Sequence, residues 1–281
     1  MNRLLPPARL EAAAIVRTGK SSFAPAFRLL AADRRADLET LYAFCRAADD
    51  IADADGHEAT DRHAALEAWR AAFRDPGLQG LPDSLRDLMA RRGLERRLFL
   101  ELLDGTATDL TAPVRMATRA DLDLYCHRVA GTVGQLCLPI FGADAEHATA
   151  YAETLGRALQ YTNILRDTKP DLARGRIYYP LDELSAAGVA SFPDGAHDYL
   201  RSFAQKTDAL FDEAASLSPR EDARALRPAR VMASIYRSLL RKMRRDGLKV
   251  TEKHYRLSAP EKLLAVARTL LLGRRASPRA A

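Results

Sequence analysis

Two pairs of aspartates, each spaced for one face of a helix, are the residues of this chain best suited to carry out chemistry. Asp49 and Asp53 lie in the segment YAFCRAADDIAD, and Asp167 and Asp171 lie in QYTNILRDTKPD. Residues four apart on a helix lie about one turn from each other on the same face. Two such pairs facing each other across a cavity would hold Mg²⁺ ions, and the ions would hold a diphosphate.

Each pair belongs to a longer polar stripe of helical spacing. The first stripe comprises Tyr42, Arg46, Asp49 and Asp53, and the second comprises Gln160, Asn163, Asp167 and Asp171, with Arg166 beside it. Carboxylate and amide oxygens are the ligands that Mg²⁺ prefers. The candidate metal ligands are therefore Asn163 and the four aspartates. Mg²⁺ takes one or two carboxylates and completes its shell with water and phosphate oxygens, which suits a shared cluster of two or three ions.

The proposed chemistry explains why the charges should gather. A diphosphate leaves readily only when cations neutralise the charge that develops as the C–O bond breaks. Four carboxylates around an empty cavity repel one another, by about 1 kcal/mol for each pair 4 Å apart in water. One DxxxD sequence alone is common on helix surfaces, so the argument depends on the two copies. A di-metal carboxylate bundle is disfavoured because its Glu-x-x-His signature is missing.

Apolar periodicity indicates helices throughout, with no strand-like alternation. We expect helices near 22–31, 34–54, 61–74, 83–91, 94–109, 118–140, 144–168, 196–216, 221–245 and 259–272. Asp61 and Asp144 are predicted N-caps, and Pro228 should start or kink its helix. Pro170 cannot donate a hydrogen bond to the carbonyl of residue 166, so the helix should kink or end there and displace Asp171.

Composition favours a single all-α domain over residues 1–281, with about 1–18 and 273–281 as flexible ends. Apolar residues make up 47% of the 281 residues, which is enough for a large core, and no Gly/Ser-rich linker divides the chain. The three cysteines lack CxxC spacing, so we expect neither a zinc site nor a disulfide framework. Reduced cysteines indicate a cytoplasmic protein. The N-terminus lacks a signal-peptide pattern, and no apolar run reaches the ~20 residues of a membrane span.

The net charge of +6 is spread over short basic clusters. No basic motif interleaved with aromatic residues appears, so nucleic acid is not an expected partner. The basic surface suits simple solvation, a polyanionic substrate or an anionic membrane. The C-terminal segment KLLAVARTLLLGRR has a leucine-rich stripe with basic flanks. We expect it to be a last helix packed on the core, with an interfacial helix that touches the inner membrane face as the alternative.

The motifs YAFCRAADDIAD, YCHRVAGTVG and QYTNILRD…D…RGRIYYP resemble those of the squalene/phytoene synthase family, in order and spacing, from about Gly19 to Leu272. The resemblance implies an all-α class I isoprenoid-synthase fold with a central cavity. Within the family, KSSF and GLKVTEKHYRLSAPEKL are most similar to bacterial presqualene diphosphate synthases. The implied reaction is a Mg²⁺-dependent head-to-head condensation of two farnesyl diphosphates to presqualene diphosphate, without NADPH.

The resemblance also implies roles for individual positions. It makes Asp49, Asp53, Asp167 and Asp171 the Mg²⁺–diphosphate ligands, and it places Tyr125 near the reacting carbons. It assigns substrate contacts to Gly19, Lys20, Ser21, Ser22, Tyr42, Arg46, Gln160, Asn163, Arg166, Arg174 and Arg176.

Alternatives remain at this point. Phytoene, dehydrosqualene and squalene synthases share the motifs, and chain length depends on cavity-floor side chains that sequence does not place. A non-catalytic helical binding or assembly module of the same fold is the alternative of another class, with Pro170 as its best support. The oligomeric state is not predicted.

Overall fold

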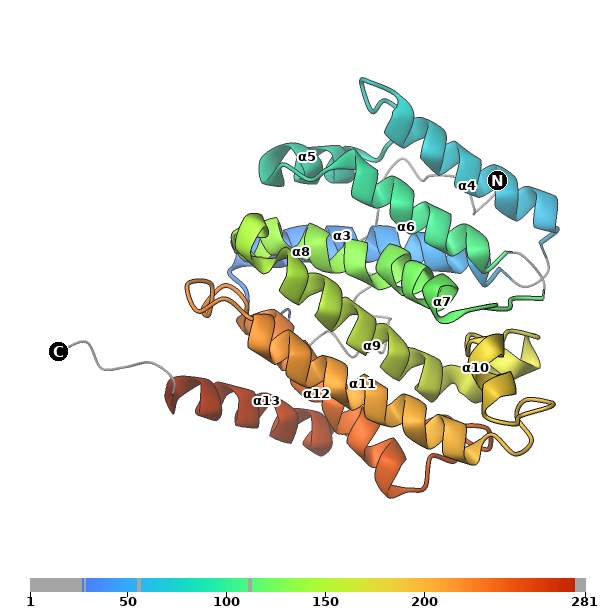
Figure 1. Ribbon diagram of the computed structural model, residues 1–281. Helices are drawn as coiled ribbons and strands as arrows, with labels where there is room; N and C mark the ends of the chain where they lie inside the picture. The colour runs from blue at the N-terminus through green and yellow to red at the C-terminus, as the bar shows by residue number, and fades with distance from the viewer. Residues whose placement is uncertain (1–26, 28, 55–56, 111–112, 276–281) are drawn as a thin grey trace.

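The computed structural model describes residues 27, 29–54, 57–110 and 113–275, with side chains up to Leu271. Helices make up most of this part of the chain, and no β-strand occurs in it (Figure 1). They are α3 (Ala32–Ala52), α4 (Ala59–Arg74), α5 (Asp83–Arg92), α6 (Arg96–Thr108), α7 (Arg119–Cys126), the π-helical turn η1 (His127–Gly131), α8 (Thr132–Phe141), α9 (Ala145–Ala173), α10 (Leu181–Ala186), α11 (His197–Leu217), α12 (Arg227–Arg245) and α13 (Ala259–Arg275). The predicted all-α fold class is confirmed.

The long helix α9 runs through the middle of the molecule. It packs against α8 and η1 on one side and against α11 and α12 on the other (Figure 1). The helix α3, which carries Asp49 and ends at its C-cap Asp53, packs against α4, α5, α6 and α8. Both α3 and α9 therefore pack against α8.

An aromatic cluster fixes α3 to its neighbours. The Phe44 ring lies edge-on to Trp69, Phe73 and Phe99, with centroids 5.2, 5.5 and 5.2 Å away. All four side chains are almost fully buried, and edge-to-face pairs of this kind add to the stability gained from burial. This cluster holds one face of α3 in the core and leaves the polar stripe of that helix on another face.

Two glycines allow α9 to approach its neighbours closely. A Cβ atom built at Gly156 would lie 2.8 Å from the carbonyl oxygen of Ala130 in η1. One built at Gly134 in α8 would lie 2.8 Å from the carbonyl oxygen of Ala152 in α9. These distances leave no room for a methyl group, so backbone contact sets the spacing between the helices here.

Pro170 does not end its helix, so of the two outcomes predicted for it, a kink or an end, the end is wrong. The helix α9 continues through Pro170 to Ala173. Proline removes one helical hydrogen bond, but here it lies in the last turn, where little helix remains to be broken. The backbone N–H of Arg174 still donates to the carbonyl oxygens of Pro170 and Asp171, at 3.3 and 3.0 Å. Asp171 therefore stays on the helix.

Other local predictions had mixed outcomes. The Asp144 side chain caps α9 by accepting a hydrogen bond from the N–H of Glu146, as predicted. Asp61 is not an N-cap, because the chain becomes helical earlier and Glu58 holds that position. The helix α12 starts with Pro228 in its first turn, as predicted. The segment predicted as one helix over 118–140 is divided by η1, and the short α10 was not predicted.

The C-terminal helix α13 packs on α12 through a narrow face. Ala265 is buried, and its carbonyl oxygen accepts a hydrogen bond from the hydroxyl of Ser234. The leucines behave differently: Leu263, Leu264 and Leu271 are 69%, 51% and 64% exposed. The last helix therefore packs on its neighbour α12, as expected, but it does so through Ala265, while most of the leucine stripe is exposed. None of the described helices is long and apolar enough to cross a membrane.

Candidate active site

A cavity of about 1260 Å³ lies between α3, α6, the α7–α8 segment, α9 and α12. Its lining residues fall into a charged group and an apolar group. The charged and amide side chains are Arg46, Asp49, Asp50, Asp53, Asp109, Gln160, Asn163, Arg166, Asp167, Asp171, Arg176, His254, Arg256 and Lys262. The apolar walls include Leu38, Leu41, Val133, Cys137, Leu138, Phe141, Leu155, Leu159, Met232, Ile235 and Leu239.

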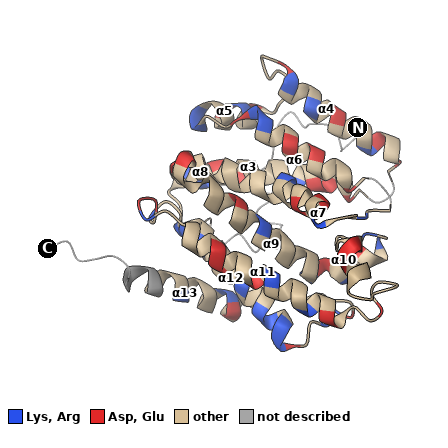
Figure 2. Ribbon diagram, viewed as in Figure 1, with Lys and Arg blue, Asp and Glu red and all other residues tan. Residues whose placement is uncertain are grey.

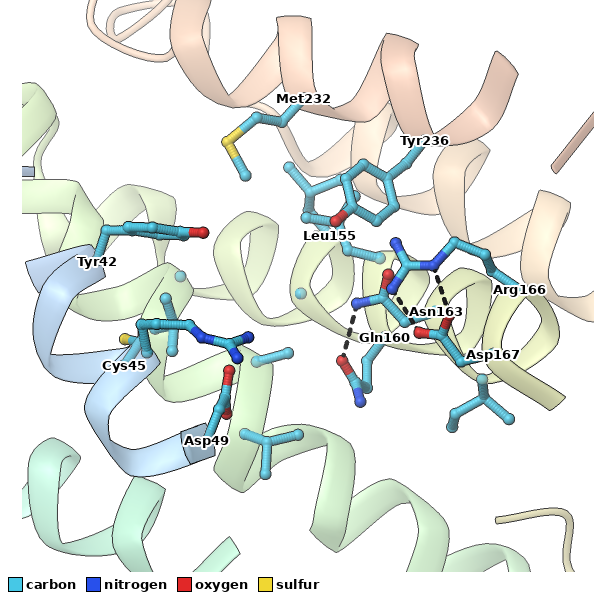
Figure 3. Close-up of a pocket in the computed structure, with 18 of the residues that line it drawn as sticks. Tyr42, Cys45, Asp49, Leu155, Gln160, Asn163, Arg166, Asp167, Met232 and Tyr236 are labelled. Carbon is cyan, nitrogen blue, oxygen red and sulfur yellow. Dashed lines mark hydrogen bonds and ion pairs between the residues drawn. The ribbon is translucent and has the colours of Figure 1, made fainter. Parts of the chain in front are cut away.

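The two acidic pairs line this cavity from different helices. Figure 3 shows Asp49 on α3 and Asp167 on α9 on opposite sides of the open space. Asp53 and Asp171 line the same cavity. The spatial arrangement on which the sequence hypothesis depended is therefore present, although the roles of these side chains remain predictions.

Arginines hold one carboxylate of the first pair. Oδ1 of Asp53 lies 2.9 Å from NH1 of Arg174 and 2.9 Å from NH1 of Arg176. Arg46 pairs with the neighbouring Asp50 at 2.5 Å. These guanidinium groups thus lie beside the candidate metal ligands, where they could also contact an anion.

The two aspartates of the second pair, Asp167 and Asp171, differ in their interactions with the protein. Asp167 accepts two hydrogen bonds from the adjacent Arg166, at 2.8 and 2.5 Å, and its Oδ1 lies 2.9 Å from Nε2 of His254 (Figure 3). Within the described part of the chain, no hydrogen bond or ion pair of the Asp171 carboxylate is present. One member of the pair is thus neutralised by the protein, and the other is not.

Asn163 supports the assignment of hard-cation chemistry. Its amide nitrogen donates to Oε1 of Gln160 at 3.2 Å, whereas its Oδ1 is buried without a hydrogen-bond partner. A buried oxygen without a partner is costly and calls for a ligand. Carboxylates and an amide oxygen together form a donor set that fits Mg²⁺.

No three acidic, histidine or cysteine side chains of the described residues converge closely enough to hold a metal alone. Mg²⁺ normally takes only one or two carboxylates and obtains its other ligands from water and substrate phosphate. The separated carboxylates therefore fit ions that arrive together with a diphosphate better than a permanently bound metal.

Electrostatics at the site match this interpretation. Dehydration by the surrounding protein raises the pKa of Asp49 to about 7, with Asp109 and Asp53 adding repulsion. Asp49 has accessible surface, but that surface faces the cavity, where protein atoms enclose it. Dehydration likewise raises the pKa of Asp171 to about 7, helped by the charge of Asp167. A cation bound near them would offset the dehydration and mutual repulsion of these carboxylates.

A carboxylate that the sequence did not reveal lies beside Tyr125. Oδ2 of Asp109 accepts a hydrogen bond from the Tyr125 hydroxyl at 3.0 Å, and Oδ1 accepts one from Tyr178 at 2.6 Å. The two tyrosine rings stack with centroids 5.1 Å apart. Burial raises the pKa of Asp109 to about 6 and that of Tyr125 well above its usual value. The Tyr125 hydroxyl is thus neutral and held in one orientation at the cavity wall.

Three basic residues that sequence reasoning also missed are His254, Arg256 and Lys262. They line the cavity from the segment between α12 and α13 and from the first turn of α13. The only sequence signal was the density of basic residues in EKHYRLSAPEK, which indicates charge but not direction.

The remaining predicted residues are divided between the cavity and the part of the chain outside the structural description. Tyr42 and Gln160 line the cavity, and Arg176 lines it beside Asp53. Arg174 reaches Asp53 and does not itself line the cavity. The segment Gly19, Lys20, Ser21 and Ser22 lies outside the described residues.

Comparisons with known proteins agree with this geometry. The squalene/phytoene synthase family matches residues 16–261. A presqualene diphosphate synthase of Zymomonas mobilis is 36% identical over 83% of this chain and 83% of its own length. A phytoene synthase of Mycobacterium tuberculosis is 35% identical over 91% and 88%.

A solved structure leads to the same conclusion. A ligand-bound dehydrosqualene synthase superimposes with a TM-score of 0.80 and 25% identity, covering 94% of this chain and 95% of the other. The match extends over the whole helical assembly around the cavity and is not confined to one motif. This chain belongs to the squalene/phytoene synthase family.

Proposed function

We propose that the protein catalyses the Mg²⁺-dependent head-to-head condensation of two farnesyl diphosphates to presqualene diphosphate. As a member of its family it is a prenyltransferase. The observation that carries the proposal is that two aspartate pairs, from the segments of α3 and α9, line one cavity whose walls also include many aliphatic side chains. Relatives from three bacteria bear the name of this synthase, at 34–36% identity.

The charged and amide side chains that line the cavity suit the binding of a diphosphate. Asp49, Asp53, Asp167, Asp171 and Asn163 would hold the ions, with Arg46, Arg166 and Arg176 nearby to contact phosphate oxygens. Bound Mg²⁺ supplies charge neutralisation to the leaving diphosphate. Asp167 already contacts Arg166 and His254, so we expect these two side chains to shift toward the phosphate when a diphosphate binds.

The volume of the cavity and its apolar lining residues suit two prenyl chains. A cavity for one drug-sized ligand measures about 300–1,000 Å³, and this cavity measures about 1260 Å³. Its aliphatic walls exclude water from the reacting carbons. This exclusion protects an allylic cation from capture by water.

The reaction breaks the C–O bond of one substrate and the π bond of the other, forms two C–C bonds and releases one proton. The C–O bond of one substrate breaks, and the diphosphate leaves with the electron pair. The double bond of the second substrate attacks the allylic cation, and loss of a proton closes a cyclopropane. The second substrate keeps its diphosphate, so the product is a diphosphate. The Tyr125 hydroxyl, held by Asp109, lies at the cavity wall and is our candidate for the proton transfer.

Phytoene synthesis from C20 diphosphates is the second candidate, because phytoene synthases are as similar as 35% over 91% of the chain. A non-catalytic module is disfavoured, since all four aspartates line the cavity and Pro170 does not displace Asp171. Squalene or dehydrosqualene formation would need steps beyond presqualene diphosphate.

One product analysis tests the proposal. Purified protein is incubated with farnesyl or geranylgeranyl diphosphate, with Mg²⁺ or EDTA, and with or without NADPH. We expect presqualene diphosphate from the C15 substrate, the same with and without NADPH, and no product in EDTA. Phytoene from the C20 substrate would show that the protein is a phytoene synthase instead. A C30 hydrocarbon from the C15 substrate would show that the reaction continues beyond presqualene diphosphate. A folded protein that turns over neither substrate would favour the binding module.

A further inference from the structure

The leucines of α13 form an exposed apolar face. Leu263, Leu264, Leu270 and Leu271 are 69%, 51%, 37% and 64% exposed, and their spacing places them on one side of the helix. They are four of the eight large apolar side chains that the structure records as exposed. We call these four residues the α13 leucine face. Such a concentration of exposed apolar surface on one short helix marks an interaction site.

The part of the chain that carries this face is rich in positive charge. Residues 241–275 contain eleven Lys and Arg and only three Asp and Glu, a net charge of +8 against +6 for the whole chain. The rest of the chain is therefore slightly acidic. Figure 2 shows basic residues gathered at the C-terminal end of α12, and Lys242 there lies 3.0 Å from Glu261 in the first turn of α13. The apolar face and the excess positive charge thus belong to the same part of the molecule.

The face also begins beside the cavity. Lys262 lines the cavity, whereas the next two residues, Leu263 and Leu264, are exposed on the outside. Leu257 and Arg256, just before the helix, line the cavity as well, and Arg256 is exposed. The cavity therefore reaches the surface near the start of the α13 leucine face.

We propose that the α13 leucine face and its basic surroundings dock the protein on an anionic lipid surface. Leucines entering the acyl boundary gain hydrophobic free energy, and Lys and Arg gain from anionic headgroups. A second copy of the chain is a poorer occupant, because its own α13 region would bring the same large positive charge to the contact. Docking would place the cavity rim next to lipid, which suits the apolar product of the proposed function, although the surface itself does not depend on that function.

Vesicle co-sedimentation without substrate tests this proposal independently of turnover. The wild-type protein should pellet with vesicles of phosphatidylcholine and phosphatidylglycerol, and much less with phosphatidylcholine alone or at high salt. The double variant Leu263→Gln/Leu271→Gln should bind anionic vesicles at least ~10-fold more weakly, because two apolar side chains no longer enter the acyl boundary. Glutamine keeps the helical propensity of the segment.

A matched double variant provides the control. Leu124→Gln/Leu217→Gln removes two leucines that are 48% and 39% exposed on α7 and α11, and it should bind vesicles like the wild type. Circular dichroism should show equal helix content in all three proteins. The proposal is overturned if the wild type does not pellet with anionic vesicles, or if both double variants bind equally. It is also overturned if changing the α13 leucine face abolishes self-association of the wild type and leaves vesicle binding unchanged.

Discussion

Replacing Asp171 with asparagine should stabilise the ligand-free protein at pH 8, although it removes a candidate metal ligand. Dehydration raises the pKa of Asp171 from 3.8 to about 7. A carboxyl group whose pKa is raised on folding contributes its full stability below its unfolded pKa, and that contribution is lost as the pH rises through the folded pKa. Asparagine does not ionise and escapes this loss.

The size of the effect follows from the shift. Roughly three pKa units at about 1.4 kcal/mol each give a ceiling of about 4 kcal/mol at pH 8. Asp171 is only partly buried, and solvent screens its charge, so we expect a smaller gain of about 1–2 kcal/mol at pH 8. The gain should fall to less than half at pH 5, where Asp171 in the folded protein is mostly protonated.

Urea unfolding followed by circular dichroism, in EDTA at pH 5 and pH 8, measures this difference. Asp87→Asn on the exposed face of α5 is the control and should change stability by less than about 0.5 kcal/mol at either pH. A loss of stability at pH 8, or an equal gain at both pH values, would refute the reasoning that burial and neighbouring charges make the ionised Asp171 carboxylate destabilising.

Adding Mg²⁺ and pyrophosphate should make the wild type more stable than the Asp171→Asn variant at pH 8. Saturating Mg²⁺ and pyrophosphate, at about 100 times their Kd, should stabilise the wild type by about 3 kcal/mol at pH 8. Asp171→Asn should gain much less, because a ligand to the cation is gone. Equal gains in both proteins would place the cation elsewhere.

Three further predictions concern turnover. Asp49→Ala and Asp167→Ala should each lower it by at least about 10²-fold with helix content unchanged; near-normal turnover in either would contradict the metal assignment. Asp109→Asn should lower kcat about 10- to 100-fold, since it weakens a charge-assisted hydrogen bond to Tyr125. The kcat of Tyr125→Phe should fall by a similar factor. An unaffected kcat in both variants would show that this pair takes no part in the proton transfer. Pro170→Glu should change turnover by less than about threefold, because α9 already continues past residue 170; a large increase would show that proline impairs the natural site.

The sequence predicted the helices and the polar stripes well because both depend on spacing within one segment. Asp49, Asp53, Asp167 and Asp171 lie where helical periodicity placed them, once two helices face the same cavity. The prediction for Pro170 failed because it applied a rule for helix interiors to a residue in the last turn.

Residues whose partners lie far along the chain could not be found in this way. Asp109 carries no pairing signal of its own, and its role depends on Tyr125 and on Tyr178, which is 69 residues away. His254 reaches Asp167 across 87 residues, so only the folded chain brings the two together. Exposure of the leucines on α13 was equally hidden, since an amphipathic stripe looks the same whether it faces a core or a membrane.

The glycine contacts of α9 have an evolutionary consequence. Gly134 and Gly156 line the cavity and let α9 touch α8 and η1, so two positions without a side chain help to set the helix spacing at the cavity wall. A single added methyl group at residue 156 would force η1 and α9 apart and reshape the cavity, leaving every charged group unchanged. A related protein could thus come to make a product of different chain length through a substitution at residue 156. Comparing only the charged residues of the site would not reveal such a change.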